Sequence, residues 1–309
     1  MKLVSFSLPG SPKQVQPGLL KGEAIFPLPY DSVLSVIEQT SALPEKMDQI
    51  ASLIHQTESL PLKSVRLHAP LPNPRSLRDA YAFEQHVAAA YANRNRPVPE
   101  EWYQFPVFYF SNHLAVFGPG EVIPYPAGSR SLDYELEVAC IIGKEGRDIQ
   151  PDDAEEHIFG YTIFNDWSAR DIQRLETRVG LGPAKGKDFA SSFGPWIVTT
   201  DELADHSAGR PGVFDLEMRA RINGRERSCG NWKDIHYSFG EIITRMSAGV
   251  TLHPGEVIGS GTVGTGCLLE ITRNQGPWLQ PGDQVALEIQ CLGILANQVE
   301  PVSSQNGAL

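Results

Sequence analysis

The sequence predicts a β-dominated α+β fold with a small N-terminal unit. From about residue 105 to residue 300, short apolar runs alternate with PG, GD and NG turns, a pattern typical of many short strands. The 28 glycines and 24 prolines are spread along the chain, which favours frequent turns over a disordered tail. Only a few short helical patterns interrupt the strands, so strands dominate the prediction.

Residues 1–70 are expected to form the N-terminal α+β unit. Two strand-like pieces, KLVSFSL and GEAIFPL, precede expected helices over about 31–40 and 45–57. Apolar residues in the second helix recur at three- and four-residue spacing, which predicts one buried face. The proline-rich segment 69–74 indicates a linker, and residues 71–309 are expected to form the main domain.

The main domain is expected to begin with a helix from about Leu77 to Ala92. The stretch LDYELEVACII, residues 132–142, is expected to be a strand that enters the core. Short helices are predicted near 152–157, 168–176 and 238–248, between the strand-like runs.

Charge and composition narrow the possible partners. The net charge is −11, which argues against nucleic acid and anionic membranes but leaves an anionic small molecule possible through a local basic pocket. The N-terminus lacks a long apolar signal core and no run of about 18 apolar residues occurs, so a cytoplasmic protein is expected. The four cysteines form no CxxC pair, so the usual zinc and redox spacings are absent. Three of them lie in apolar strand-like runs, which indicates reduced core cysteines.

Two glutamates stand two residues apart in LDYELEVACII. Side chains of a strand alternate between its faces, so Glu135 and Glu137 point the same way, about 7 Å apart. Two explanations are open: a solvated edge strand, or a divalent cation that turns their repulsion into attraction. Carboxylate oxygens suit Mg²⁺, Ca²⁺ or Mn²⁺.

The stretch YTIFNDWSARDIQRLE places another carboxylate at a strand end. Asp166 follows an apolar run, and Ser168 with Asp171 fits a loose helix cap. Arg170 and Gln173 are three residues apart and share a helix face. This is either a capped surface helix, or a third metal carboxylate with two donors beside it.

The stretch SLRDAYAFEQH can also be interpreted either as ordinary helix structure or as part of a functional site. Ser76 and Asp79 fit a helix cap, while Asp79 and His86 would lie two turns apart on one helix face. A single helix histidine is usually structural, but the other seven histidines lack comparable neighbours.

Two glycine-containing turns complete the set of candidates. GPAKGKDF fails the spacing of a phosphate-binding loop, so Lys187 is expected to reach a local anion. GSGTVGTGCLLE is expected to expose Thr262 and to lead into an apolar strand holding Glu270, either facing outward or as a buried functional carboxylate.

These elements, in this order over residues 76–300, resemble the fumarylacetoacetate hydrolase family, through the ExE, NDWSARDxQ and GKxF motifs. The resemblance implies a mixed β-roll with a central metal site, in a homodimer. It implies that Glu135, Glu137 and Asp166 bind a divalent metal, Mg²⁺ first, with Ca²⁺ or Mn²⁺ as alternatives. Asp79, in DAYAFEQH, matches a fourth ligand.

The resemblance also implies roles for the remaining candidates. His86 matches a catalytic base that Glu270 orients. Arg170, Gln173 and Lys187 match groups that polarise the carbonyl. Tyr81, Tyr109 and Thr262 match family positions that contact the substrate. The chain departs from the family where a tyrosine is expected, at Thr177 or Arg178, and where an arginine is expected, near Arg94 and Arg96; its N-terminal region is also shorter.

The implied reaction is hydrolysis of a C–C bond in a 1,3-diketo acid, fumarylacetoacetate or a related acylpyruvate. One alternative is a decarboxylase, hydratase or isomerase acting on oxaloacetate or a 2-oxo-dienoate. Many such relatives carry a His-x-x-Glu pair, whereas here Ala89 stands three residues after His86. Another alternative is a metal-stabilised binding module without catalysis.

Overall fold

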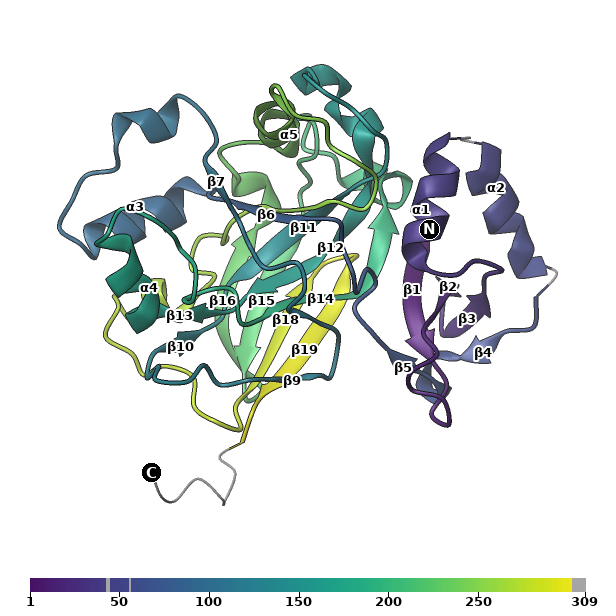
Figure 1. Ribbon diagram of the computed structural model, residues 1–309, viewed down its shortest axis with the longest axis horizontal. Helices are drawn as coiled ribbons and strands as arrows, with labels where there is room; N and C mark the ends of the chain where they lie inside the picture. Colours follow the sequence, from purple (N-terminus) through teal and green to yellow (C-terminus); the bar gives the residue numbers. More distant parts are fainter. Residues whose placement is uncertain (43–44, 56, 302–309) are drawn as a thin grey trace.

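The protein is built around mixed β-sheets with helices at their edges and over their faces (Figure 1). The computed structural model describes residues 1–42, 45–55 and 57–301. The predicted β-dominated α+β fold is confirmed. Residue 56 of the second expected helix and the last eight residues of the expected main domain lie outside the described residues.

The largest sheet runs in the order β4-β3-β2-β1-β14-β12-β11-β17-β6-β7, with β5 beside β1 and β8 beside β14. Its strands are β1 Lys2–Ser7, β2 Gln16–Lys21, β3 Ala24–Pro27, β4 Leu60–Pro61, β5 Arg66–Leu67, β6 Leu77–Ala80, β7 Phe108–Phe110, β8 Val116–Phe117, β11 Leu136–Ile142, β12 Ile158–Asp166, β14 Ser191–Thr199 and β17 Val257–Gly259. Most neighbours are antiparallel, but β17 with β6 and β14 with β8 are parallel, so the sheet is mixed.

A second sheet runs β16-β15-β18-β19-β9, and β10 pairs with β13 in a short ribbon. The strands are β9 Val122–Ile123, β10 Leu132–Asp133, β13 Ser168–Ala169, β15 Glu217–Ile222, β16 Arg225–Asn231, β18 Gln284–Ile289 and β19 Gly293–Val299. The helices are α1 Val33–Ala42, α2 Glu45–Ser52, α3 Glu84–Ala92, α4 Arg170–Thr177, α5 Phe239–Ser247 and α6 Leu268–Ile271. In the described part of the chain, no helix combines the length and apolar character that a membrane span needs.

Strand β11 divides the core into two layers. Val138 and Cys140 belong to the cluster that β11 shares with the second sheet, which includes Met218. Ala139 and Ile141 belong to the opposite cluster, which includes Ile37 of α1. The predicted alternation is therefore confirmed along β11, and the whole strand is buried. The expected single strand over 132–142 is wrong in its first part, because Leu132–Asp133 form β10 in a separate ribbon with β13, and Glu135 lies just before β11.

The N-terminal strands continue the large sheet. β1 pairs with β14 at Lys2 and Leu3, and β14 pairs with β12 on its other side. The sheet thus runs from the N-terminal region into the strands that carry the candidate site. Figure 1 shows the N-terminal strands and α1 and α2 together at one side of the molecule.

The structure corrects two predictions about the site strands. The expected helix from Leu77 to Ala92 is wrong in its first half, because residues Leu77–Ala80 form β6 between β17 and β7, and α3 begins only at Glu84. Pairing with strands distant in sequence overrides the local helical pattern. A solvated edge strand at Glu135 and Glu137 is also wrong, because β11 lies between β12 and β17.

A buried ion pair joins the two parallel strands at the centre. Arg78 of β6 contacts Glu256, just before β17, and both side chains are less than 10% exposed. Glu256 also accepts hydrogen bonds from the Ser76 hydroxyl at 2.7 Å and the His253 amide at 3.0 Å. Removing one partner leaves an uncompensated buried charge.

We therefore expect Glu256→Gln to lower the free energy of unfolding by about 3–5 kcal/mol in urea denaturation. Glu156→Gln, which removes an exposed partner of Lys144, serves as the control and should change it little. A double Arg78→Met, Glu256→Met variant should be less destabilised than Glu256→Gln. Equal losses in Glu256→Gln and Glu156→Gln would contradict this account.

Candidate metal centre and acid–base site

The predicted site residues meet around a cavity of about 270 Å³. It lies where β6, the start of β11, α3 and α4 converge. Predicted residues that line it are Asp79, Tyr81, His86, Tyr109, Glu135, Glu137, Arg170, Gln173, Lys187 and Thr262. Asp166 and Glu270 lie directly behind this lining, where each is hydrogen-bonded to a residue that lines the cavity. Tyr109 contacts Asp166, and His86 contacts Glu270.

Three carboxylates converge from neighbouring strands. Asp79 of β6, Glu137 of β11 and Asp166 at the end of β12 each offer an oxygen within 4.8 Å of the other two. Gly259 of β17 separates β6 from β11, and a Cβ there would lie 2.3 Å from Oδ1 of Asp79. The Gly261 amide donates to Asp79 at 3.2 Å and to Glu137 at 3.1 Å.

The electrostatics of this trio favour a bound cation. Burial and the neighbouring carboxylates raise the pKa of Asp79 and of Glu137 well above their ordinary values. Burial also raises the pKa of Asp166, although Lys187 opposes it. Oδ1 of Asp166 is buried without a hydrogen-bond partner. Three hard oxygen donors with an unsatisfied lone pair fit a hard divalent metal ion.

Glu135 differs from the trio because two cations hold it. Nη2 of Arg170 donates to it at 2.7 Å, and the Lys187 ammonium contacts both Glu135 and Asp166. Burial disfavours its charge, but Arg170 and Lys187 hold the pKa of Glu135 below its usual range. Its oxygens already have partners, so it borders the trio rather than completing it.

Arg170 is fixed by a residue that the sequence analysis did not select. Asp133 of β10 accepts from Nε of Arg170 at 2.9 Å and from the amides of Leu268 and Leu269 at the start of α6. Arg170 also donates to Oε1 of Gln173, as their shared helix face predicts. This contact leaves the amide NH₂ group of Gln173 available to a bound molecule.

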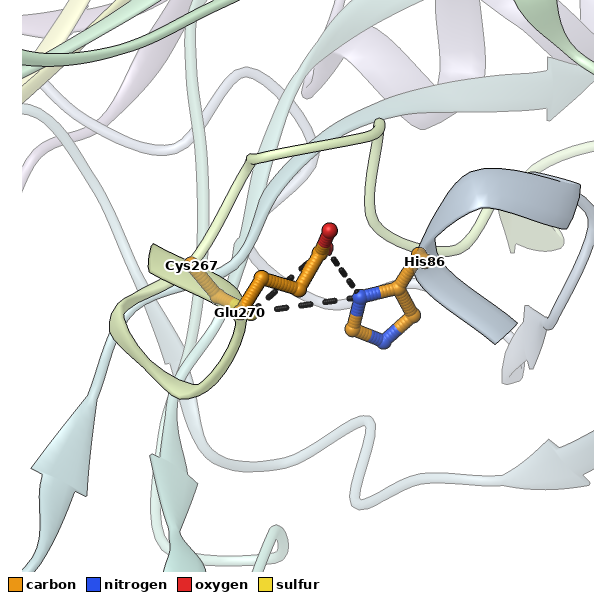
Figure 2. A group of neighbouring side chains, drawn as sticks. All are labelled: His86, Cys267 and Glu270. Atoms are coloured by element: carbon orange, nitrogen blue, oxygen red, sulfur yellow. Dashed lines mark hydrogen bonds and ion pairs between the residues drawn. The ribbon is translucent and has the colours of Figure 1, made fainter. Parts of the chain in front are cut away.

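His86 and Glu270 form a buried pair on the other side of the cavity. Nδ1 of His86 lies 2.5 Å from Oε1 of Glu270 (Figure 2). Its Nε2 lies 3.8 Å from Oε1 of Glu135. The Thr265 amide holds the second oxygen of Glu270 at 2.9 Å. A carboxylate only accepts hydrogen bonds, so the contact with Glu270 favours the tautomer of His86 with its proton on Nδ1, in which the Nε2 lone pair faces the side of Glu135.

Several local expectations about these residues are wrong. Glu270 lies in α6, not in a strand, and the cap of its turn is Cys267. Asp79 and His86 lie on different elements, so they meet through tertiary packing and not through helical spacing. α4 begins at Arg170 without a side-chain cap, because the Ser168 hydroxyl donates to the backbone carbonyl of Asp166.

The three predicted substrate contacts all reach the cavity. Tyr109 donates to Asp166 at 2.5 Å, and the Tyr81 ring packs edge-on against His86 at 5.4 Å. Thr262 is buried, contrary to the expected exposure, and its hydroxyl donates to Glu137 at 3.3 Å. Of the two candidate arginines, Arg94 lines the cavity.

Known proteins resemble this chain in both sequence and fold. The profile of the fumarylacetoacetate (FAA) hydrolase C-terminal region matches residues 76–300. An oxaloacetate tautomerase of Bacillus subtilis is 31% identical, over 77% of this chain and 74% of its own. A fumarylacetoacetase of Oryza sativa is 33% identical over 64% of this chain, and the match spans 58% of its own length.

A solved structure agrees over almost the whole chain. The fumarylacetoacetate hydrolase of Exiguobacterium antarcticum superposes with a TM-score of 0.77 at 29% identity, covering 97% of this chain and 99% of its own. A maleylpyruvate hydrolase of Sphingobium, solved with manganese(II) and pyruvate, has a TM-score of 0.72 at 23% identity, covering 97% and 99%, and supports the fold.

Thermal unfolding can test whether the three carboxylates Asp79, Glu137 and Asp166 bind a metal. In EDTA, we expect Asp79→Asn to have a higher Tm than the wild type, because it removes one of three mutually repelling carboxylates. We expect Mg²⁺ to raise the Tm of the wild type but not that of Asp79→Asn. A ligand at 100 times its Kd stabilises a protein by about 2.7 kcal/mol. The exposed control Asp152→Asn should behave as wild type. A full Mg²⁺ response in Asp79→Asn would exclude the trio as the metal site.

Proposed function

Because the chain belongs to the fumarylacetoacetate hydrolase family, we propose that it is a divalent-cation-dependent hydrolase that cleaves a C–C bond in a 1,3-diketo acid. The relatives named above are a hydrolase or a tautomerase, so the family supports enzymatic chemistry on oxo acids more broadly. The observation that supports the narrower proposal is the partner of His86. Glu270 of α6 holds its Nδ1, whereas many decarboxylase, hydratase and isomerase relatives are expected to carry a His-x-x-Glu pair, and this chain has Ala89 at that position.

The carboxylate trio Asp79, Glu137 and Asp166 would hold the cation, with Glu135 beside it. When bound, a hard cation such as Mg²⁺ supplies Lewis-acid polarisation of substrate oxygens and offsets the negative charge of the site. Ca²⁺ and Mn²⁺ also prefer oxygen ligands, so the activity assays below compare all three ions.

His86 supplies the base in the proposed reaction. Its Nε2 takes a proton from water, and the remaining hydroxide adds to the acyl carbonyl carbon. Glu270 accepts from Nδ1–H throughout, which fixes the ring and stabilises the imidazolium that forms. The amide oxygen of Gln173 is held by Arg170, and its NH₂ group would donate to the developing oxyanion. When the C–C bond breaks, Nε2–H returns its proton to the leaving carbon, and two acids result.

Arg170 and Lys187 act mainly through Glu135 in this proposal. Both are buried and already bonded to carboxylates, so they set the charge and position of Glu135 rather than standing free for substrate. Arg94 at the cavity lining is exposed and stacks on Tyr91, with 5.9 Å between the guanidinium and the ring centroid. It offers a cation to the carboxylate of an incoming oxo acid.

Tautomerisation of oxaloacetate is the second candidate, favoured by the similarity to the Bacillus subtilis enzyme over 77% of the chain. It needs the same base, but moves a proton within the substrate and breaks no C–C bond. A panel of acylpyruvates, acylacetoacetates and oxaloacetate, assayed with Mg²⁺, Mn²⁺ and Ca²⁺, separates the two. Acid products from a diketo acid support the hydrolase. Accelerated enol–keto exchange of oxaloacetate alone supports the tautomerase, and a site that binds metal but turns over none of them supports a binding module.

The proposed base gives a kinetic prediction. His86→Gln should lower kcat by about 10²–10⁴-fold, the usual contribution of general base catalysis, while the Mg²⁺-induced rise in Tm remains. The readouts are steady-state kinetics and thermal unfolding of the same samples. Near wild-type turnover in His86→Gln would remove His86 from the mechanism.

Glu270 gives a separate prediction as a positioning residue. Glu270→Gln keeps the shape but lets the amide donate as well as accept, so Nδ1–H is no longer enforced. We expect kcat to fall with little change in KM. A change confined to KM would instead indicate that Glu270 affects substrate binding.

A further inference from the structure

Among the described residues, two groups of side chains could hold a metal ion, and they differ in chemistry. The first is the oxygen-only trio. The second consists of His86, Cys267 and Glu270, which offer one nitrogen, one sulfur and one oxygen. Figure 2 shows the three side chains meeting between α3, which carries His86, and the turn that begins α6.

The distances within the second group are close to those of a zinc site. Sγ of Cys267 lies 3.9 Å from Nδ1 of His86 and 3.8 Å from Oε1 of Glu270. Tetrahedral zinc, with bonds of about 2.0–2.3 Å, separates its ligand atoms by roughly 3.3–3.6 Å. The sulfur therefore needs to move only a few tenths of an ångström. The His86–Glu270 pair, now 2.5 Å apart, must open by less than about 1 Å as a metal replaces the shared proton.

The surroundings are those of a built site. Cys267 is fully buried, and the side chains of His86 and Glu270 are 6% and 5% exposed. The Thr265 amide holds the second oxygen of Glu270, which is the support that metal-binding carboxylates usually have. His86 also lines the cavity, with Cys267 and Glu270 behind that lining, so an ion that reaches the group from solvent would pass beside the His86 ring.

We propose that His86, Cys267 and Glu270 form a second metal site, selective for borderline-soft ions such as Zn²⁺ or Cd²⁺, and that its occupation inhibits the enzyme. Thiolate and imidazole ligands favour such ions, whereas the carboxylate trio favours hard ions. The two sites would therefore differ in metal selectivity, because the carboxylate trio would bind Mg²⁺ and the second site would bind Zn²⁺ or Cd²⁺.

Inhibition follows from the proton positions, and this part rests on the proposed role of His86 as the base. A metal on Nδ1 displaces that proton, and a neutral imidazole then carries its proton on Nε2. The lone pair that would accept a proton from water is lost. The Cys267 thiol releases its proton to solvent when the metal–sulfur bond forms, so one proton leaves for each ion bound.

The test is a CdCl₂ titration in excess MgCl₂, followed by the ultraviolet charge-transfer absorption of a cadmium–thiolate bond. The background protein carries Cys229→Ser and Cys291→Ser, because these thiols are exposed and half-buried and would bind cadmium themselves. We expect a saturable absorption equivalent to one ion per chain. Adding Cys267→Ser should abolish it. No absorption in the background, or absorption that persists after Cys267→Ser, would overturn the site.

A second variant covers the case in which Cys267→Ser fails to fold. His86→Gln in the same background keeps the thiol but loses the nitrogen ligand, and should weaken cadmium binding at least tenfold. Unchanged affinity would overturn the proposal. This absorption needs no turnover, so it tests the site even if the proposed reaction is wrong.

The inhibitory effect is measured separately, with ZnCl₂ on whichever substrate of the panel is turned over. Each variant is compared with its own rate in Mg²⁺ alone. Cys267→Ser should raise the zinc concentration for half-inhibition at least tenfold. An unchanged half-inhibition concentration would show that zinc inhibits elsewhere.

Discussion

The candidate site depends on a charge imbalance that is buried in the protein. Five carboxyl groups and two cations lie together with almost no solvent exposure: Asp79, Asp133, Glu135, Glu137, Asp166, Arg170 and Lys187. The cations pair with Asp133 and Glu135, and Lys187 also contacts Asp166, so the excess negative charge falls mainly on Asp79 and Glu137. Burying unpaired charge is costly, and the raised pKa values of Asp79 and Glu137 express that cost. A bound divalent cation would remove most of that cost, and metal binding would then be coupled to the folding of this region.

The sheet determines where this excess gathers. β6, β17, β11 and β12 are successive neighbours, although they come from opposite ends of the main domain. A glycine at position 259 lets the Asp79 carboxylate approach across β17, and the positive φ of Gly261, +77°, turns its amide toward two carboxylates. The helices α3 and α6 then bring the imidazole and its partner to the same cavity.

Local patterns in the sequence predicted the parts of the site that strands carry. Strand alternation placed Glu135 and Glu137 on one face, and the end of an apolar run marked Asp166. The patterns marked His86 and Glu270 only as candidates, and the resemblance supplied their roles as base and orienting acid. Helical spacing joined Asp79 to His86 for a wrong reason, because the pairing of β6 with a strand almost 180 residues later has no local signal. Asp133, Gly261 and Cys267 were missed, since their contacts exist only after distant segments meet.

The pairing of β1 with β14 has a consequence for dissecting this protein. The C-terminal half of β14 has β12 on one side and β1 on the other, so the N-terminal segment caps what would otherwise be an open strand edge. An uncapped, apolar edge is a template for aggregation. A fragment that starts at the linker would expose Ile197 and Val198 along that edge. Shortened versions made for crystallisation or screening should therefore retain the first strand, even though none of its residues lines the candidate cavity.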